Sequence, residues 1–242
     1  MSKILFLFIT IIAIAFSYID IQAWKYCLAT IVILYCYKKV YEFQSKKILG
    51  ISFSKNNILP FIIISTICAV LFNFYITEVI SDSTIQRTSP LTFLLWFIQP
   101  LFQSFNEEVI FRAQYFHHIK KYITHKAIQS ILFSIIFSLG HGVFFKFAMN
   151  IELNFNVYFS LFVATLIMNH LFFVTNNIAL SWALHFGINF SFFGGKYFQD
   201  GAKLNDAEIF NLILGDEKIL VPSIVALLIF LAVMGLNRLK AK

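Results

Sequence analysis

Charged side chains are scarce in this sequence. Only 13% of its 242 residues are charged and 59% are apolar, whereas soluble domains are about a quarter charged and about half apolar. Proline and glycine are also few, with 4 and 9 residues against 31 phenylalanines. The composition argues against a water-soluble fold and against a disordered or low-complexity chain.

The sequence has only three cysteines, Cys27, Cys36 and Cys68, and each lies within an apolar stretch. Their spacings match neither a metal knuckle nor a redox pair, so we interpret them as packing residues. A His-Glu-x-x-His zinc motif is also absent. None of these features predicts a thiol-based or a conventional zinc site.

The net charge of the chain is +7, which could suggest nucleic-acid binding. The basic residues, however, fall in short flanks between long apolar runs, as at Lys38-Lys39, Lys46-Lys47 and Lys120-Lys121. The positive-inside rule gives this distribution in membrane proteins. We therefore expect the lipid bilayer, and no nucleic acid, as a partner.

A transmembrane helix needs about 20 mostly apolar residues, and about eight stretches approach that length. They run from Ile4 to Ile19, Ile21 to Tyr37, Ile58 to Ile80, Leu91 to Ile119, Ala127 to Phe145, Phe155 to Thr175, Ile178 to Phe193 and Ile219 to Leu236. No repeat, linker or second domain is visible. The sequence thus predicts one all-α membrane domain over residues 1–242, a polytopic bundle of about eight transmembrane helices.

The first stretch has a second interpretation as a signal peptide, because Ala13-Ile14-Ala15 resembles a small-x-small cleavage site. The apolar run continues past this site to Ile19. This continuation favours a retained membrane span.

Loop charges predict the orientation of the spans. The segments from Lys38 to Lys55 and from Lys120 to Lys126, and the chain end after Asn237, are basic and fall on one side if there are eight spans. The segment from Gly194 to Glu217 is acidic and falls on the other side. We predict a multi-pass protein of the cell membrane with both termini in the cytoplasm.

Ionisable groups inside spans cost about 2.5 to 3.5 kcal/mol each, so they are functional-site hypotheses. Three polar clusters interrupt the predicted spans. They are Asn106-Glu107-Glu108-Val109-Ile110-Phe111-Arg112, Phe137-Ser138-Leu139-Gly140-His141-Gly142 and His185-Phe186-Gly187-Ile188-Asn189. The site is predicted where these three spans meet.

Helical geometry relates the residues within each cluster. Glu108 and Arg112 are four residues apart, so they share a helix face and can form an ion pair. Glu107 then points about 100° away and is available for chemistry. His185 and Asn189 are also four apart, so an imidazole and a carboxamide project from one face.

Depth along the helices permits a shared site. At about 1.5 Å per residue, Glu107 lies about 21 Å from Lys121 and His141 about 25 Å from Thr124. His185 lies only about 14 Å from Asn176, so helix tilt or a shifted boundary must absorb the difference.

Structural roles are the alternative for single residues. Glu108 and Arg112 could simply brace their span, and His170 beside Asn169 fits a helix-helix contact. Two glutamates, two histidines and an asparagine on three spans are harder to explain by packing alone.

The three clusters resemble, in order, the EExxxR, FxxxH and HxxxN motifs of the CPBP family. This family comprises the CAAX proteases and bacteriocin-processing enzymes and is also called the Abi family. The resemblance covers Leu91 to Phe193 and implies an intramembrane endopeptidase. It implies that Glu107 and His141 activate water and that His185 and Asn189 stabilise the oxyanion, with Glu108 and Arg112 as supporting residues.

A buried carboxylate suits a general base, because low dielectric raises its pKa towards neutrality. Imidazole and amide donors suit an oxyanion hole, where one donor contributes about 3 to 4 kcal/mol. Glu107, His141 and His185 could instead ligate a divalent metal such as zinc. We favour the metal-independent form, with no cofactor.

Two other functions remain open. One is a non-enzymatic membrane immunity or scaffold protein, and the other is a proton-coupled transporter, although neither internal repeats nor broken helices are visible. The substrate is expected to be a membrane-associated peptide or protein. A composition rich in Ile, Lys, Phe and Asn suggests a bacterial source, which makes prenylated substrates a weaker expectation than peptide precursors.

Overall fold

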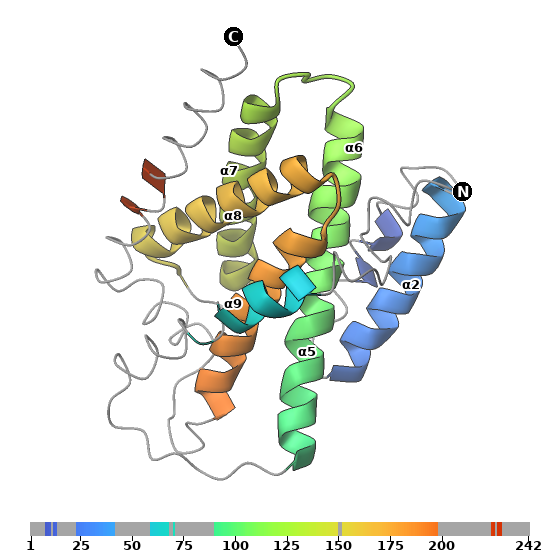
Figure 1. Ribbon diagram of the computed structural model, residues 1–242, viewed down its shortest axis with the longest axis vertical. Coiled ribbons are helices and arrows are strands. Elements are labelled where there is room, and N and C mark those ends of the chain that lie inside the picture. The colour runs from blue at the N-terminus through green and yellow to red at the C-terminus, as the bar shows by residue number, and fades with distance from the viewer. Residues whose placement is uncertain are drawn as a thin grey trace. The chain divides into compact units, whose positions relative to one another are not determined.

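A computed structural model describes residues 8–10, 12–13, 23–41, 59–67, 70, 90–149, 152–197, 224–225 and 227–228. Every regular element in these ranges is a helix, which confirms the predicted all-α class. The labelled elements of Figure 1 are α2 (Ala23–Tyr41), α5 (Pro90–Glu108), η2 (Val109–Tyr115), α6 (Phe116–Ile119), α7 (Lys126–Met149), α8 (Phe155–Thr175) and α9 (Ala179–Tyr197).

Five predicted spans correspond closely to these helices. The span from Leu91 to Ile119 coincides with α5, η2 and α6, which follow one another as one rod in Figure 1. The span from Phe155 to Thr175 has the bounds of α8. The predicted spans at residues 4–19, 58–80 and 219–236, and the acidic segment after residue 197, lie largely or wholly outside the described residues.

Two of the described helices are long and apolar enough to cross a membrane, over Lys126–Phe147 and Phe155–Thr175. The first of them also exposes a row of large apolar side chains, which suits contact with lipid tails better than contact with water. These residues are Ile128, Ile131, Leu132, Ile135, Ile136, Leu139, Val143 and Phe147.

The chain divides into two compact units. The first unit comprises Met1–Thr124 with Leu171–Asp200, and the second comprises His125–His170 with Gly201–Lys242. Of the described helices, α2, α5, η2, α6 and α9 belong to the first unit and α7 to the second. Helix α8 lies in the second unit up to His170.

Apolar packing joins α2, α5 and α9 in the first unit. A buried cluster contains Ile33, Cys36 and Tyr37 of α2 together with Phe105, Val109 and Ala113, and also includes Ile178 just before α9. Cys36 therefore packs as predicted, whereas Cys68 lies outside the described residues. The indole of Trp182 on α9 packs against Phe105 and donates a hydrogen bond from Nε1 to the carbonyl of Leu101, 3.1 Å away.

Helix α5 changes geometry directly after the glutamates. The seven residues from Val109 to Tyr115 form a π-helix, which holds more residues per turn than an α-helix. Local π-helical turns are frequent at functional sites, and this one contains Arg112. The apolar pattern of the span predicted a regular helix and gave no sign of this change.

The spans predicted from Phe155 to Thr175 and from Ile178 to Phe193 are joined by a short bend at residues 176–178. Asn176 has a φ of 53°, in the left-handed region that asparagine tolerates better than most residues. The side-chain oxygen of Asn177 then accepts the backbone N–H of Ala179 at 2.9 Å. This bond caps the first turn of α9 and sets where the helix that carries His185 begins.

Polar side chains link α7 and α8 within the second unit. The amide of Asn169 donates to the carbonyl of Ser130 and to the hydroxyl of Ser134, each at 3.2 Å. The hydroxyl of Ser138 donates to the carbonyl of Tyr158 at 2.7 Å. Apolar helices in a lipid bilayer have no hydrophobic driving force for association, so such hydrogen bonds help to hold them together. Asn169 thus joins the two helices next to His170, for which a helix contact was predicted.

Candidate active site

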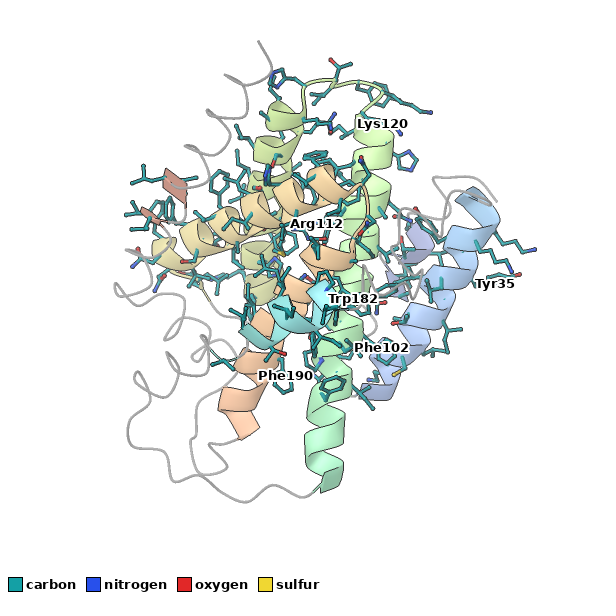
Figure 2. All side chains as sticks on the ribbon, in the orientation of Figure 1. Tyr35, Phe102, Arg112, Lys120, Trp182 and Phe190 are labelled. Atoms are coloured by element: carbon teal, nitrogen blue, oxygen red, sulfur yellow. The ribbon has the colours of Figure 1, made fainter. Side chains whose placement is uncertain are left out.

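The predicted ion pair is present at the end of α5. Nη1 of Arg112 donates to Oε1 of Glu108 at 2.7 Å, and both side chains are fully buried. Arg112, labelled in Figure 2, extends from η2, so the pair spans the junction between the α-helical and π-helical turns. Neither charge could remain buried without the other, because a lone buried ion is strongly destabilising.

His185 of α9 contacts both glutamates. Its Nδ1 lies 2.9 Å from Oε1 of Glu108, and its Nε2 lies 3.5 Å from Oε2 of Glu107. All three side chains are buried. Helix α9 runs obliquely to α5 in Figure 1.

Hydrogen-bond chemistry defines the protons on His185. The Glu108 carboxylate can only accept, so Nδ1 carries a hydrogen. In a neutral ring, Nε2 would then present its lone pair to the Glu107 carboxylate, which is repulsive. Protonation of Nε2 would replace this repulsion by attraction and would make the cluster of Glu107, Glu108, Arg112 and His185 electrically neutral.

Asn189 follows His185 by one turn of α9, as predicted, and its side chain is partly buried. The first unit therefore contains five of the six predicted site residues. Four of them form the polar cluster of Glu107, Glu108, Arg112 and His185.

His141 lies on α7 in the second unit and is held by its own helix. Its Nδ1 is 2.9 Å from the carbonyl of Phe137, which can only accept. Nδ1 therefore carries the hydrogen, and in the neutral ring the basic lone pair is on Nε2. The ring also packs on the Phe137 ring, with centroids 4.4 Å apart. One phenylalanine thus sets both the tautomer and the orientation of His141.

Glycines flank His141 on both sides, and their surroundings differ. A Cβ atom built at Gly142 would lie 2.0 Å from the hydroxyl oxygen of Tyr158, whereas one at Gly140 meets nothing within 4 Å among the described residues. The phenol of Tyr158 thus packs directly on the backbone next to His141. Gly142 is required for this contact. It was visible in the second polar cluster, but nothing in the sequence indicated its contact with Tyr158.

The donor set partly fits a metal ion. Two ligands of a tetrahedral zinc ion lie about 3.3 Å apart, close to the 3.5 Å between Glu107 and His185. The hydrogen bond from His185 to Glu108 is of the kind that orients metal-bound histidines. Within the described ranges, no group of three His, Cys, Asp or Glu side chains is arranged to hold a metal.

A second polar link in the first unit was not predicted. The amide of Asn106 donates to the carbonyl of Tyr26 on α2 at 3.2 Å. The hydroxyl of Thr30 lies 2.7 Å from Oδ1 of Asn106 and 2.8 Å from the same carbonyl. Asn106 was visible as part of the first polar cluster, but nothing in the sequence indicated its partner.

Residues 89–191 match the Rce1-like family of type II CAAX prenyl endopeptidases. This match confirms the resemblance based on the three motifs, and the Rce1-like segment contains all six predicted site residues. The family is a protease family whose members are membrane proteins. No curated protein and no solved structure matches the chain.

Substitution of the two glycines should separate their roles. We expect Gly142→Ala to displace Tyr158 and to destabilise the protein by about 1 to 3 kcal/mol, as overpacking does. Gly140→Ala should be neutral or stabilising by up to about 1 kcal/mol, because alanine favours the helix. Thermal unfolding of both variants in detergent measures this, and equal stability of the two would contradict the assigned contact.

Proposed function

We propose that this protein is an intramembrane endopeptidase that hydrolyses a peptide bond of a membrane-associated protein or peptide. One observation carries the proposal: within an Rce1-like segment, a buried histidine contacts both glutamates of the EExxxR motif. Buried charge is costly in a membrane protein, and retaining it requires a function. The proposal includes a multi-pass chain of about eight spans.

In the proposed reaction, Glu107 and Nε2 of His141 bind one water molecule between them. As the water oxygen attacks the scissile carbonyl, one of these bases takes its proton. The negative charge moves to the carbonyl oxygen, and the tetrahedral intermediate forms. The retained proton then passes to the amide nitrogen as the carbon–nitrogen bond breaks, giving a carboxylic acid and an amine, and the acid then passes its proton to the amine.

His185 and Asn189 would stabilise the oxyanion. Because Nδ1 of His185 is held by Glu108, its Nε2–H, which faces Glu107 in the structure, would be the donor that turns to the developing charge. The Asn189 side chain, one turn away, would supply a second donor.

Glu108 and Arg112 act through His185 in this proposal. The Glu108 carboxylate fixes the ring orientation, and Arg112 neutralises that carboxylate. The two residues are therefore positioning residues as well as structural ones. This arrangement resembles the carboxylate that orients the histidine in hydrolytic triads.

We propose that catalysis needs no metal, since one shared proton accounts for the close approach of Glu107 and His185. In the alternative, Glu107, His141 and His185 would hold a divalent ion such as zinc. Such an ion would supply Lewis-acid activation of water.

Substitution of the two bases tests the proposed function. We expect Glu107→Gln and His141→Ala to reduce cleavage of a membrane peptide by about 10² to 10⁴-fold, the contribution typical of general acid–base groups. Both proteins should remain folded, because each substitution removes no ion-pair partner of Arg112. Cleavage is measured by mass spectrometry on a peptide that the wild-type protein cuts.

Two controls accompany these variants. Glu152→Gln alters an exposed glutamate that pairs with Lys146 and should cleave like the wild type. Glu108→Ala strands Arg112 and should lower the amount of folded protein, by about 3 to 5 kcal/mol in stability. Undiminished cleavage by Glu107→Gln would refute the assignment of the base.

Chelation decides the role of a metal. We expect purified protein to retain full cleavage activity after exhaustive treatment with a chelator, because the proposed proton transfers need only side chains. Loss of activity that returns on addition of zinc, but not of magnesium, would replace the metal-independent form by the metal-bound one.

A further inference from the structure

Helix α2 lies outside the Rce1-like segment, yet it is bonded to the residue beside the predicted base. Asn106 is the immediate neighbour of Glu107 and is 1% exposed, and Thr30 is 5% exposed. Their side chains and the carbonyl of Tyr26 form a closed set of short polar contacts, between 2.7 and 3.2 Å. Two of these contacts, from Asn106 to the carbonyl of Tyr26 and from Thr30 to Asn106, join α2 to α5.

The polar link lies beside a cluster of apolar contacts between the same two helices. Ile33, Cys36 and Tyr37 pack against Phe105 and Val109. Apolar packing is not directional, so it sets the separation of two helices more strictly than their rotation. Hydrogen bonds have preferred angles and narrow distance ranges. The link at Asn106 therefore defines the rotation of α5 about its own axis.

Rotation of α5 is what places Glu107. A carboxylate about 6 Å from the helix axis moves about 2 Å when the helix turns by about 20°. That displacement is large against the 3.5 Å between Glu107 and His185. It is also large against the tolerance of catalysis, since a misplacement of about 1 Å can lower a rate about 10²-fold. The π-helical turns that follow Glu108 would not by themselves hold α5 against this rotation.

We propose that Thr30 and Asn106 are positioning residues for Glu107. They lock α5 to α2 so that the carboxylate keeps its distance from His185 during the reaction. The proposal rests on the proposed function, because it assigns a role relative to the base of that reaction. The proposal adds α2 to the candidate active site, although α2 lies outside the segment that matches the family.

A purely structural link makes a different prediction. Asn169 with Ser130 and Ser134 is such a link in the second unit, and it borders none of the predicted site residues. If Thr30 has the same role, its loss should lower stability and leave turnover per folded molecule unchanged. If Thr30 positions Glu107, turnover should fall while substrate affinity is retained.

The experiment compares three threonine variants on a synthetic membrane peptide that the wild-type protein cleaves. Thr30→Val keeps the volume and removes the hydroxyl, and Thr30→Ser restores the hydroxyl. Thr165→Val is the matched control, because Thr165 is likewise buried and its hydroxyl has no hydrogen-bond partner among the residues that the structure describes. We measure kcat, KM and the thermal unfolding temperature of each.

We expect Thr30→Val to lower kcat by about 10 to 100-fold with KM within about twofold. Thr30→Ser should recover most of the lost kcat, and Thr165→Val should match the wild type. Asn106→Leu should also lower kcat, and the double variant Thr30→Val with Asn106→Leu should lose little more than Asn106→Leu alone, because the two residues act through one link.

An unchanged kcat in both Thr30→Val and Asn106→Leu overturns the positioning role. So does an equal loss of kcat in Thr165→Val, which would show a general effect of core substitution. Failure of the proposed function has a different signature: Glu107→Gln would cleave as fast as the wild type, or the wild type would cleave no peptide. That result would overturn the positioning role as well.

Discussion

The neutrality of one buried cluster is the constraint on which the rest of the first unit depends. Arg112 and Glu108 are both fully buried, so each needs the other. Sharing Oε1 of Glu108 between Arg112 and His185 fixes the imidazole. The imidazole in turn lies against Glu107. Removal of Glu108 would leave Arg112 as an uncompensated buried charge at a cost of about 3 to 5 kcal/mol. The same contacts therefore stabilise the unit and position its candidate catalytic side chains.

The helices around the cluster serve this geometry in different ways. Trp182 ties α9 to the carbonyl of Leu101, which keeps His185 within reach of the end of α5. The π-helical turns begin directly after Glu108 and carry Arg112 to it. In the second unit, Phe137 orients His141, and Gly142 admits Tyr158 beside it. Each of these contacts acts on a residue of one of the three motifs.

Local features of this structure could be predicted from the sequence, and distant ones could not. The pair of Glu108 and Arg112 follows from a spacing of four residues, and the helix bounds of α8 follow from its apolar run. The contact of His185 with Glu108 joins residues 77 apart, and that of Thr30 with Asn106 joins residues 76 apart. Motif order placed His185 in a site without indicating which glutamate it contacts. The π-helix had no compositional signal, and Thr30 is an ordinary residue of an apolar helix.

The proposed activation of water requires His141 to lie close to Glu107. Chemical cross-linking tests this requirement most directly. Cysteines replace Glu107 and His141 in a chain in which Cys27, Cys36 and Cys68 are changed to alanine, and a short bifunctional thiosulfonate reagent joins thiols that lie close together. The pair of Glu107→Cys and His185→Cys is the positive control. Glu107→Cys with Tyr122→Cys is the negative one, because Tyr122 is an exposed residue beyond the end of α6 in the same unit. The account predicts that the 107–141 pair cross-links as fast as the positive control. Reaction no faster than in the negative control would contradict it.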